Sequence, residues 1–192
     1  MTIAPNRKGD LVMLFACLPT IQHPDVHVRP IEAADIEVWA RYLGDPRVYE
    51  HTSWNPESSA DLERYVWSAQ AHSADSLLRL AVASNQTDQL VGTFGFHTVS
   101  SAHRSAELSY DLAPTHWGRG IATAGACGFT RWAHESASVT RVQATVLDSN
   151  AKSQAVLERA GFVREGLLRS YRQVRGRPGD FWMYSHIEAH SH

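Results

Sequence analysis

Alternating apolar and polar positions recur along most of this chain and predict a protein rich in β-strands. Runs that alternate with a period of two, or that are short and wholly apolar between turn residues, are typical of strands. Such runs lie at residues 26–30, 77–83, 90–99, 105–112, 141–147, 162–171 and 181–187. The polar segment 85–88 joins two of these runs and predicts a β-hairpin.

Apolar residues spaced three and four positions apart predict helices between these strands. The helical segments are residues 31–43, 55–69, 121–134 and 151–159. Gly161 provides a stop after the last of them, and Asp45-Pro46 is interpreted as the break after the first. Helices therefore precede and separate the strands. This order predicts the α/β (α+β) class, with one mixed sheet flanked by helices.

Composition narrows the prediction to one soluble domain. The chain has 192 residues, of which 43% are hydrophobic, a length and apolar content that suit a single core. A net charge of −2 provides no general basic surface for nucleic acid or an anionic membrane. No apolar run reaches the roughly 18 residues that a membrane-spanning helix needs. We therefore expect neither nucleic acid nor a membrane as a partner.

The first residues are expected to form an extension. The apolar run 11–17 has the minimum length of a signal-peptide core, and Asp10 interrupts the sequence between the basic residues and this run. Cys17 and Cys127 lie far apart and do not suggest a disulfide framework. We expect a cytoplasmic protein with an amino-terminal extension at residues 1–22 and its domain at residues 23–192.

The segment 112–123 carries the clearest chemical signal. A predicted strand runs into a glycine-rich turn, and a helix with small residues follows. Free N–H groups at a helix start attract phosphate, and Gly118 and Gly120 would let the backbone approach it closely. A dinucleotide fingerprint would require a third glycine where Thr123 stands, and the Gly-Lys-Ser/Thr of a P-loop is absent. The segment therefore indicates another phosphate-containing ligand, or else an ordinary turn.

Four separated motifs resemble those of the GNAT acetyltransferases and occur in the same order. They are AELSYDL (106–112), WGRGIAT (117–123), DSNAKS (148–153) and RAGF with a following EG (159–166). Residues 26–188 are most similar to the RimJ/RimL-type branch, although Ala124 stands where that branch commonly has Glu. The resemblance implies a single-domain, GNAT-like and mostly antiparallel sheet whose splayed central strands hold acetyl-CoA.

The resemblance also implies which residues bind acetyl-CoA. The pyrophosphate would lie on the amides of the glycine loop, and the pantetheine arm would run along the strand 107–112. The cofactor-binding residues are then Leu112, Trp117, Gly118, Arg119, Gly120, Ile121, Ala122, Thr123 and Asn150. Trp117 occupies a position that is Gln or Arg in the wider superfamily and often aromatic in this branch.

Acetyl transfer from a thioester to an amine needs a proton for the departing thiolate and a neutral attacking amine. The resemblance implies that Ser153 is the general acid and that Asn150 holds the pantetheine. The alternative is that both residues only cap the helix at 151–159.

The sequence does not single out one residue as the general base. Some relatives use a late glutamate, but the matching stretch here contains Arg172, which cannot act as a base. The resemblance offers Glu107 as the catalytic base, because a carboxylate on this strand serves elsewhere in the superfamily. Glu107 could instead be structural, His97 is a third candidate, and a water relay with substrate proximity is a fourth.

The acceptor is expected to bind between the early helices and the closing hairpin. Trp54 in the polar and aromatic loop 49–55 and Tyr110 on the strand are the candidate substrate-binding residues. Arginines between positions 169 and 177 make the hairpin basic. They could attract an acidic peptide or the cofactor's 3′-phosphate, or form a solvated face.

Two function classes stay open. The first is an acetyl-CoA-dependent N-acetyltransferase that acts by direct attack on the thioester, with a protein α-amine or a small-molecule primary amine as acceptor. The second is a non-catalytic acyl-CoA-binding or regulatory domain; transfer of a longer acyl group is a further variant. The eleven histidines form neither HExxH nor a Cys/His zinc spacing, so no metal is expected. A homodimer is compatible with the resemblance.

Overall fold

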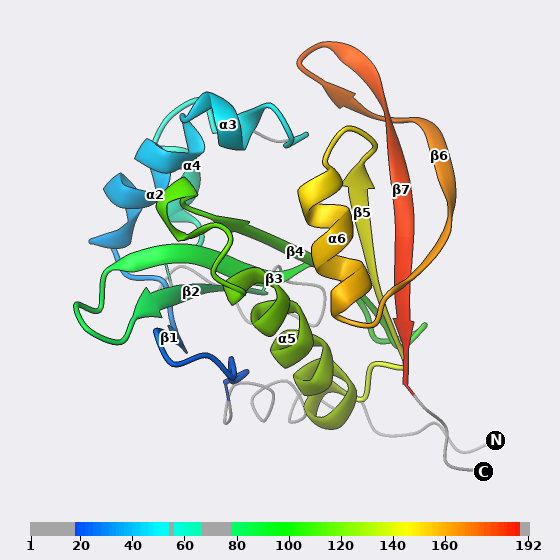
Figure 1. The fold of residues 1–192 in the computed structure, drawn as a ribbon, viewed down its shortest axis with the longest axis horizontal. Helices are drawn as coiled ribbons and strands as arrows, with labels where there is room; N and C mark the ends of the chain where they lie inside the picture. The colour runs from blue at the N-terminus through cyan, green and yellow to red at the C-terminus, as the bar shows by residue number, and fades with distance from the viewer. Residues whose placement is uncertain (1–17, 54–55, 67–77, 189–192) are drawn as a thin grey trace, which may run out of the picture.

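A seven-stranded sheet forms the centre of the protein (Figure 1). The computed structural model describes residues 18–53, 56–66 and 78–188. The strands are β1 (Val26–Arg29), β2 (Leu78–Ser84), β3 (Leu90–Ser100), β4 (Ser105–Leu112), β5 (Arg141–Leu147), β6 (Val163–Val174) and β7 (Arg177–Ile187), in the spatial order β1-β2-β3-β4-β5-β7-β6. All neighbouring pairs are antiparallel except β4 and β5, which confirms the predicted mixed, mostly antiparallel sheet.

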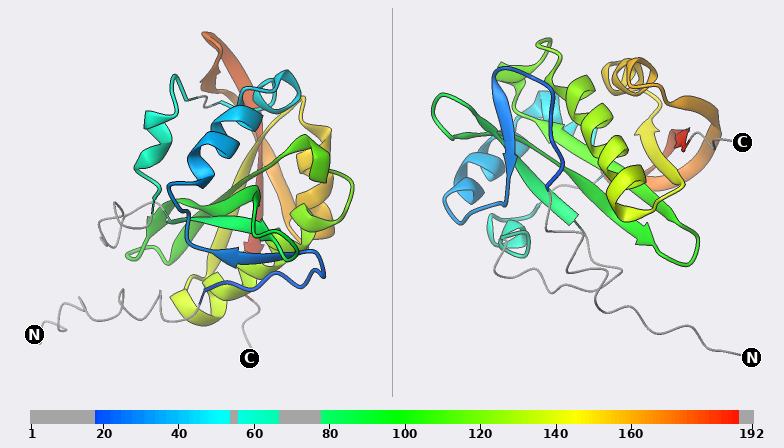
Figure 2. Two further views of the ribbon diagram at one scale, coloured as in Figure 1. Left: turned by 90° about the vertical axis from the view of Figure 1, so that its left-hand side faces the viewer. Right: turned by 90° about the horizontal axis from the view of Figure 1, so that it is seen from below.

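Helices cover both faces of this sheet (Figure 2). The helical elements are α2 (Asp35–Leu43), α3 (Pro46–Tyr49), α4 (Ala60–Glu63), the 3₁₀ turn η2 (Pro114–His116), α5 (Ile121–Ala137) and α6 (Ala151–Arg159). Phe129 of α5 and Leu157 of α6 belong to the larger core, on one face. Trp39 of α2 and Leu62 of α4 pack with Ala81 in a second core on the other face. The sheet therefore separates two hydrophobic cores.

The structure corrects two predicted helix boundaries. Asp45-Pro46 begins α3 as well as following α2, because Asp45 accepts a hydrogen bond from Arg47 N at 2.9 Å and Pro46 is favoured at the first helical position. The helix predicted over 55–69 is described only as α4, and residues 54–55 and 67–77 lie outside the described residues. The Asp61 carboxylate accepts hydrogen bonds from Glu57 N and Ser58 N, which holds that segment as a turn.

The two central strands diverge after a short paired stretch. The parallel ladder between β4 and β5 contains Ser105, Ala106 and Glu107 on β4 and ends at the pair Glu107 and Gln143. Beyond this point β4 continues along β3 to Leu112, and β5 continues along β7 to Leu147. The expected splayed strands are confirmed, and the splay opens toward the amino-terminal ends of α5 and α6.

Segments outside the sheet fix the position of the helices. Ile21 is buried in the larger core, and a Cβ at Gly128 of α5 would lie 2.1 Å from Thr20 O, so this segment packs closely on α5. Within the described part of the chain, no helix has the length and apolar character needed to cross a membrane.

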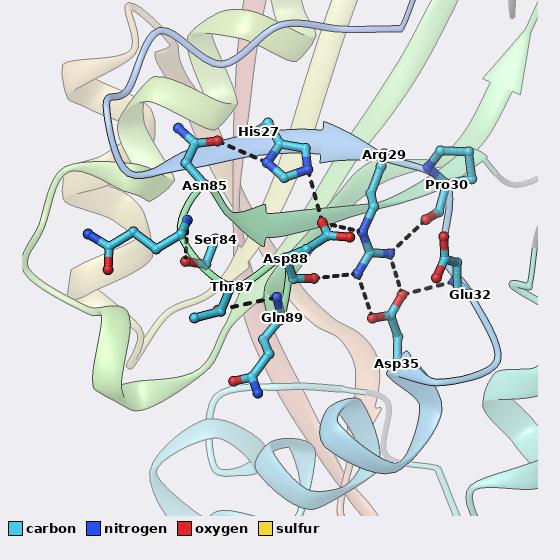
Figure 3. A network of polar contacts seen from close by, with 11 residues as sticks. His27, Arg29, Pro30, Glu32, Asp35, Ser84, Asn85, Thr87, Asp88 and Gln89 are labelled. Carbon is cyan, nitrogen blue, oxygen red and sulfur yellow. Dashed lines mark hydrogen bonds and ion pairs between the residues drawn. The ribbon is translucent and has the colours of Figure 1, made fainter.

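A polar network attaches α2 to the edge of the sheet (Figure 3). Arg29 of β1 donates to both carboxylate oxygens of Asp35, at 2.7 and 2.9 Å, and also to Asp88 in the β2–β3 turn at 3.0 Å. His27 lies 3.1 Å from the same Asp88 carboxylate. Bidentate arginine–carboxylate pairs are geometrically specific. The network therefore fixes the start of α2, the helix that carries Tyr42 to the site described below.

Two histidines join the end of α5 to β7. His134 Nδ1 donates to Val139 O at 2.7 Å, and His134 Nε2 lies 3.0 Å from His186 Nδ1, in a hydrogen bond whose donor depends on which ring nitrogens carry protons. Burial and the neighbouring His134 lower the pKa of His186 below its ordinary 6.5.

This histidine pair predicts acid lability. Because the folded state disfavours protonation of His186, the unfolded chain binds more protons, and stability should fall as the pH drops below about 6.5. His186→Gln, which retains an N–H donor for His134, should reduce that slope in denaturant titrations between pH 7 and pH 5. The exposed His103→Gln is the matched control. An unchanged slope in His186→Gln would contradict the prediction.

Candidate active site

A cavity of about 1200 Å³ lies at the splay. It is lined by the end of β4, the glycine loop, the first turns of α5 and α6, and the end of α3. Of the sequence-predicted site residues, the structure brings Leu112, Tyr110, Trp117, Gly118, Gly120, Ile121, Ala122, Thr123, Asn150 and Ser153 together in its wall. Arg119 and Glu107 are not part of this wall, and Trp54 lies outside the described residues.

The glycine loop has the backbone conformation that glycine permits. Gly118 and Gly120 adopt φ values of +75° and +84°, and a Cβ at either would meet nothing within 4 Å. These positions are therefore glycine for conformational reasons, since L-residues seldom adopt positive φ. Gly120 is the residue before α5, and the first helical hydrogen bond to it comes from Ala124 N at 3.0 Å. The amides of residues 121–123 are left to face the cavity.

This end of the cavity suits an anion. Amides at a helix start carry partial positive charge, and the first turn of α5 contains no acidic residue. Trp117 Nε1 donates to Leu112 O at 2.9 Å, which holds the loop on the end of β4. Lys152 Nζ lies 4.6 Å from the centre of the Trp117 ring. The Arg119 side chain turns away to Asp25, 2.6 Å distant, so only its backbone could contribute.

Ser153 and Tyr110 meet across the splay. Asn150 Oδ1 accepts a hydrogen bond from Ser153 N at 3.0 Å, so Asn150 does cap α6. The Ser153 hydroxyl is 2.7 Å from the Tyr110 hydroxyl, in a bond that either can donate. Tyr110 stacks on Phe94 with ring centres 4.8 Å apart, and burial raises its pKa, so it keeps its proton. The sequence assigned Tyr110 to the acceptor but gave no sign of this contact.

Glu107, Thr145, Arg172 and His97 form a cluster, the Glu107 cluster, at the point where β4 and β5 part. The Glu107 side chain is 8% exposed. Its Oε1 accepts from Thr145 Oγ1 at 2.8 Å and from Arg172 Nη2 at 3.0 Å. Among the described residues Oε2 accepts no hydrogen bond, and it is not one of the buried polar atoms that lack a partner. One oxygen is thus committed to two donors, and the other makes no hydrogen bond to the described residues.

The same arginine fixes the state of His97. Arg172 Nη2 lies 3.2 Å from His97 Nε2 and donates to it, which requires an unprotonated nitrogen there. Burial, opposed by the charge of Glu107, lowers the pKa of His97. His97 is the extra residue of a β3 bulge between Phe96 and Thr98, and bulges re-aim side chains. Of this cluster, sequence reasoning missed only Thr145.

Asp111 is a second acidic residue of β4, and it lines the cavity. The sequence did not lead to its prediction as a site residue. Its carboxylate accepts hydrogen bonds from Tyr42, from Arg79 and, at 2.8 Å, from Thr93. Burial, followed by the charge of Asp111, raises the pKa of Tyr42 well above its ordinary value. Glu107, Ser109 and Asp111 alternate along β4 and therefore share a face. That alternation was the available signal in the sequence.

The turn of the β6–β7 hairpin contacts the end of α3. Arg175, in its turn, donates to Tyr49 O and Glu50 O at the end of α3, both at 2.7 Å. Figure 1 shows this turn arching toward α3. The predicted pocket between the early helices and the closing hairpin is consistent with this contact.

Comparisons with known proteins agree with the architecture. A family model described as the acetyltransferase (GNAT) domain matches residues 25–163. The "Uncharacterized N-acetyltransferase p20" of Bacillus licheniformis is 27% identical over 172 residues, which are 88% of this chain and 96% of that protein.

Two solved structures share the fold. Mycobacterium smegmatis RimJ in complex with CoA-disulfide is 24% identical, with a TM-score of 0.71, over 84% of this chain and 81% of that one. The spermidine N-acetyltransferase from Vibrio cholerae in complex with CoA and spermine is 23% identical, with a TM-score of 0.75, over 86% of this chain and 96% of that one. The family model covers the chain from β1 through α6 and so includes both strands of the splay. The chain therefore belongs to the GNAT acetyltransferases and is an N-acetyltransferase.

Proposed function

We propose that this acetyltransferase uses acetyl-CoA and transfers the acetyl group to a primary amine by direct attack on the thioester. The observation that carries the proposal is the splay itself. It has a helix start with free amides on one side and the Ser153–Tyr110 pair in its wall, and where the strands part, outside this wall, a carboxylate has one oxygen that makes no hydrogen bond to the described residues.

The cavity fits the cofactor through backbone groups. The amides of Gly118, Arg119, Gly120, Ala122 and Thr123 would hold the pyrophosphate, since free amides at a helix start bind phosphate. The edge of β4 beyond Glu107 has no ladder partner from β5, and it would pair with the amides of the pantetheine arm. Leu112, Trp117 and Ile121 would line the arm, and Asn150 would hold its end. Acetyl-CoA supplies the activated acyl group.

Ser153 is the proposed proton donor to the departing thiolate. Its hydroxyl lies at the start of α6 and is linked at 2.7 Å to a tyrosine that burial keeps protonated. A proton given up by Ser153 Oγ can be replaced through the Tyr110 hydroxyl. The capping bond made by Asn150 uses the Ser153 backbone and leaves the hydroxyl available.

Glu107 is the proposed proton acceptor from the amine. Thr145 and Arg172 orient the carboxylate through Oε1, and Oε2 remains to accept a proton. His97 is less suited, because the lone pair on Nε2 already accepts from Arg172. The proposal therefore favours Glu107 over His97 on geometry.

An amine-panel assay tests this function. The protein would be incubated with acetyl-CoA and peptides of different first residues, amino acids or polyamines, and free thiol release would be followed; butyryl-CoA tests longer acyl groups. Release that depends on a primary amine is expected. CoA binding in calorimetry without release on any amine would favour the non-catalytic binding domain, and no CoA binding at all would overturn the cofactor assignment.

Replacing Ser153 with alanine should lower kcat by about 100-fold, at the lower end of the range of general acid catalysis. The Kd for CoA should change little, because the capping contact is with the backbone. Steady-state kinetics and calorimetry would measure the two quantities. Ser149→Ala, at an exposed serine in the preceding turn, is the matched control. Wild-type turnover in Ser153→Ala would remove Ser153 as proton donor.

A further inference from the structure

Arg172 is a cation with unused donors beside the proposed proton acceptor. Its Nη2 donates to Glu107 Oε1 and His97 Nε2, at 3.0 and 3.2 Å, which accounts for both hydrogens on that nitrogen. Within the described part of the chain, its Nε and Nη1 make no hydrogen bond. Neither of these nitrogens is among the buried polar atoms that lack a partner, so both are accessible.

The guanidinium is also held in place. Its central carbon lies 4.9 Å from the ring centre of Tyr171 and 5.7 Å from that of Phe181. Two aromatic contacts and two hydrogen bonds leave little freedom, and the side chain remains 28% exposed. A fixed arginine with free N–H donors is a preorganised site for a carboxylate.

We propose that the acceptor is a primary amine that carries a carboxylate, and that Arg172 selects it by donating a hydrogen bond from Nη1 to one oxygen of this carboxylate. The inference rests on the proposed function. The same chemistry is offered by a free amino acid and by a peptide whose first residue is acidic. In either case Glu107 Oε2 faces the amine while Arg172 faces the carboxylate.

The charges around the site support this acceptor over a polyamine. Arg172 stands beside Glu107, and the guanidinium of Arg79 lies close enough to add to the cationic field at His97. Burial is the main cause of the lowered pKa of His97; the charge of Glu107 opposes it, and the charges of Arg172 and Arg79 add to it. A polyamine would bring a second ammonium group toward Arg172. The acceptor preference should therefore differ from that of a spermidine acetyltransferase.

Matched amines test the proposal at saturating acetyl-CoA. Phenylalanine is compared with phenethylamine, lysine with cadaverine, and amidated peptides beginning with Glu are compared with those beginning with Gln. We expect kcat/KM to be at least tenfold higher for the carboxylate member of the preferred pair, with the difference mainly in KM. The amino-acid and peptide arms distinguish the two sources.

Variants of Arg172 distinguish its proposed role in selecting the acceptor from its hydrogen bond to Glu107. Arg172→Gln should bring the kcat/KM ratio within each pair close to one, and Arg172→Lys should restore part of it. Arg169→Gln, on the same strand and exposed, removes an equal charge and should change the ratio less than twofold. The proposal is overturned by equal wild-type use of both members, by a preference for the polyamine, or by an Arg172→Gln variant that slows both members equally.

A binding measurement keeps the inference separate from the proposed function. If no amine is acetylated, the proposed function fails, and calorimetry of N-acetylphenylalanine against the CoA-saturated protein still decides on Arg172. Binding that Arg172→Gln abolishes would support carboxylate recognition. No binding, or binding that the variant does not change, would overturn it.

Discussion

Replacing Glu107 with glutamine is expected to lower kcat/KM by about 100-fold or more, within the range of general acid–base catalysis. The glutamine amide keeps the size of the side chain but cannot accept the proton of the attacking amine. It also loses the charge that holds Arg172 Nη2 at 3.0 Å. The effect should fall on the chemical step, and CoA binding should be retained because Glu107 is outside the cavity wall.

The pH–rate profile distinguishes this role from a structural one. The shape of the profile of kcat/KM against pH should change in Glu107→Gln, because the glutamine amide cannot take up a proton. The pH dependence that remains belongs to the acceptor amine. Thr145→Val removes one hydrogen bond to Oε1 but leaves the carboxylate, so it should retain the profile. An unchanged profile in Glu107→Gln would exclude Glu107 as proton acceptor.

Local patterns in the sequence predicted most of the strands, because β5 alternates buried and half-buried positions and the central strands β2 and β3 are nearly continuous buried runs. The strand predicted at 141–147 and the helix at 151–159 match β5 and α6. Helix α3 was missed because Asp45-Pro46 has two local meanings, a break or a capped start, and only the surroundings choose between them.

The site was predictable only in part. Residues in the glycine loop are contiguous, so their spacing carries the information. The contacts that build the chemistry join distant positions: Tyr110 meets Ser153, and Glu107 meets Arg172. No spacing rule connects residues on different elements. The resemblance supplied Glu107 and Ser153 as candidates, but their partners depend on where β4 and β5 separate.

The splay would allow one strand to serve both halves of the proposed reaction. Successive side chains of β4 point to opposite faces. Tyr110 packs with the core under α5 and contacts α6, whereas Glu107 and Asp111 face the other way, toward β6 and α2. The proposed proton donor and proton acceptor are therefore separated by the sheet itself, with the opening between β4 and β5 as the passage.

Asp111 gives the largest expected effect on stability. Asp111→Asn should lower the free energy of unfolding by about 3–5 kcal/mol, as is typical when one charge of a buried ion pair is removed. The change takes the negative charge away from Arg79, and it weakens the hydrogen bonds from Tyr42 and Thr93. Denaturant titration followed by circular dichroism would measure the loss.

A double-mutant cycle with Tyr42 tests whether the carboxylate is the source of this stability. Tyr42→Phe alone removes one buried hydroxyl donor and should cost about 1–2 kcal/mol. In the Asp111→Asn background the same change should cost less, because the charged acceptor is already gone. Thr98→Val, on β3 and exposed, is the control and should leave the midpoint nearly unchanged.

If Asp111→Asn costs under about 1 kcal/mol, or if the two changes add without coupling, the ion pair does not stabilise the sheet. The cavity lining at Asp111 would then have to be held by the apolar packing of α2 on β2 instead.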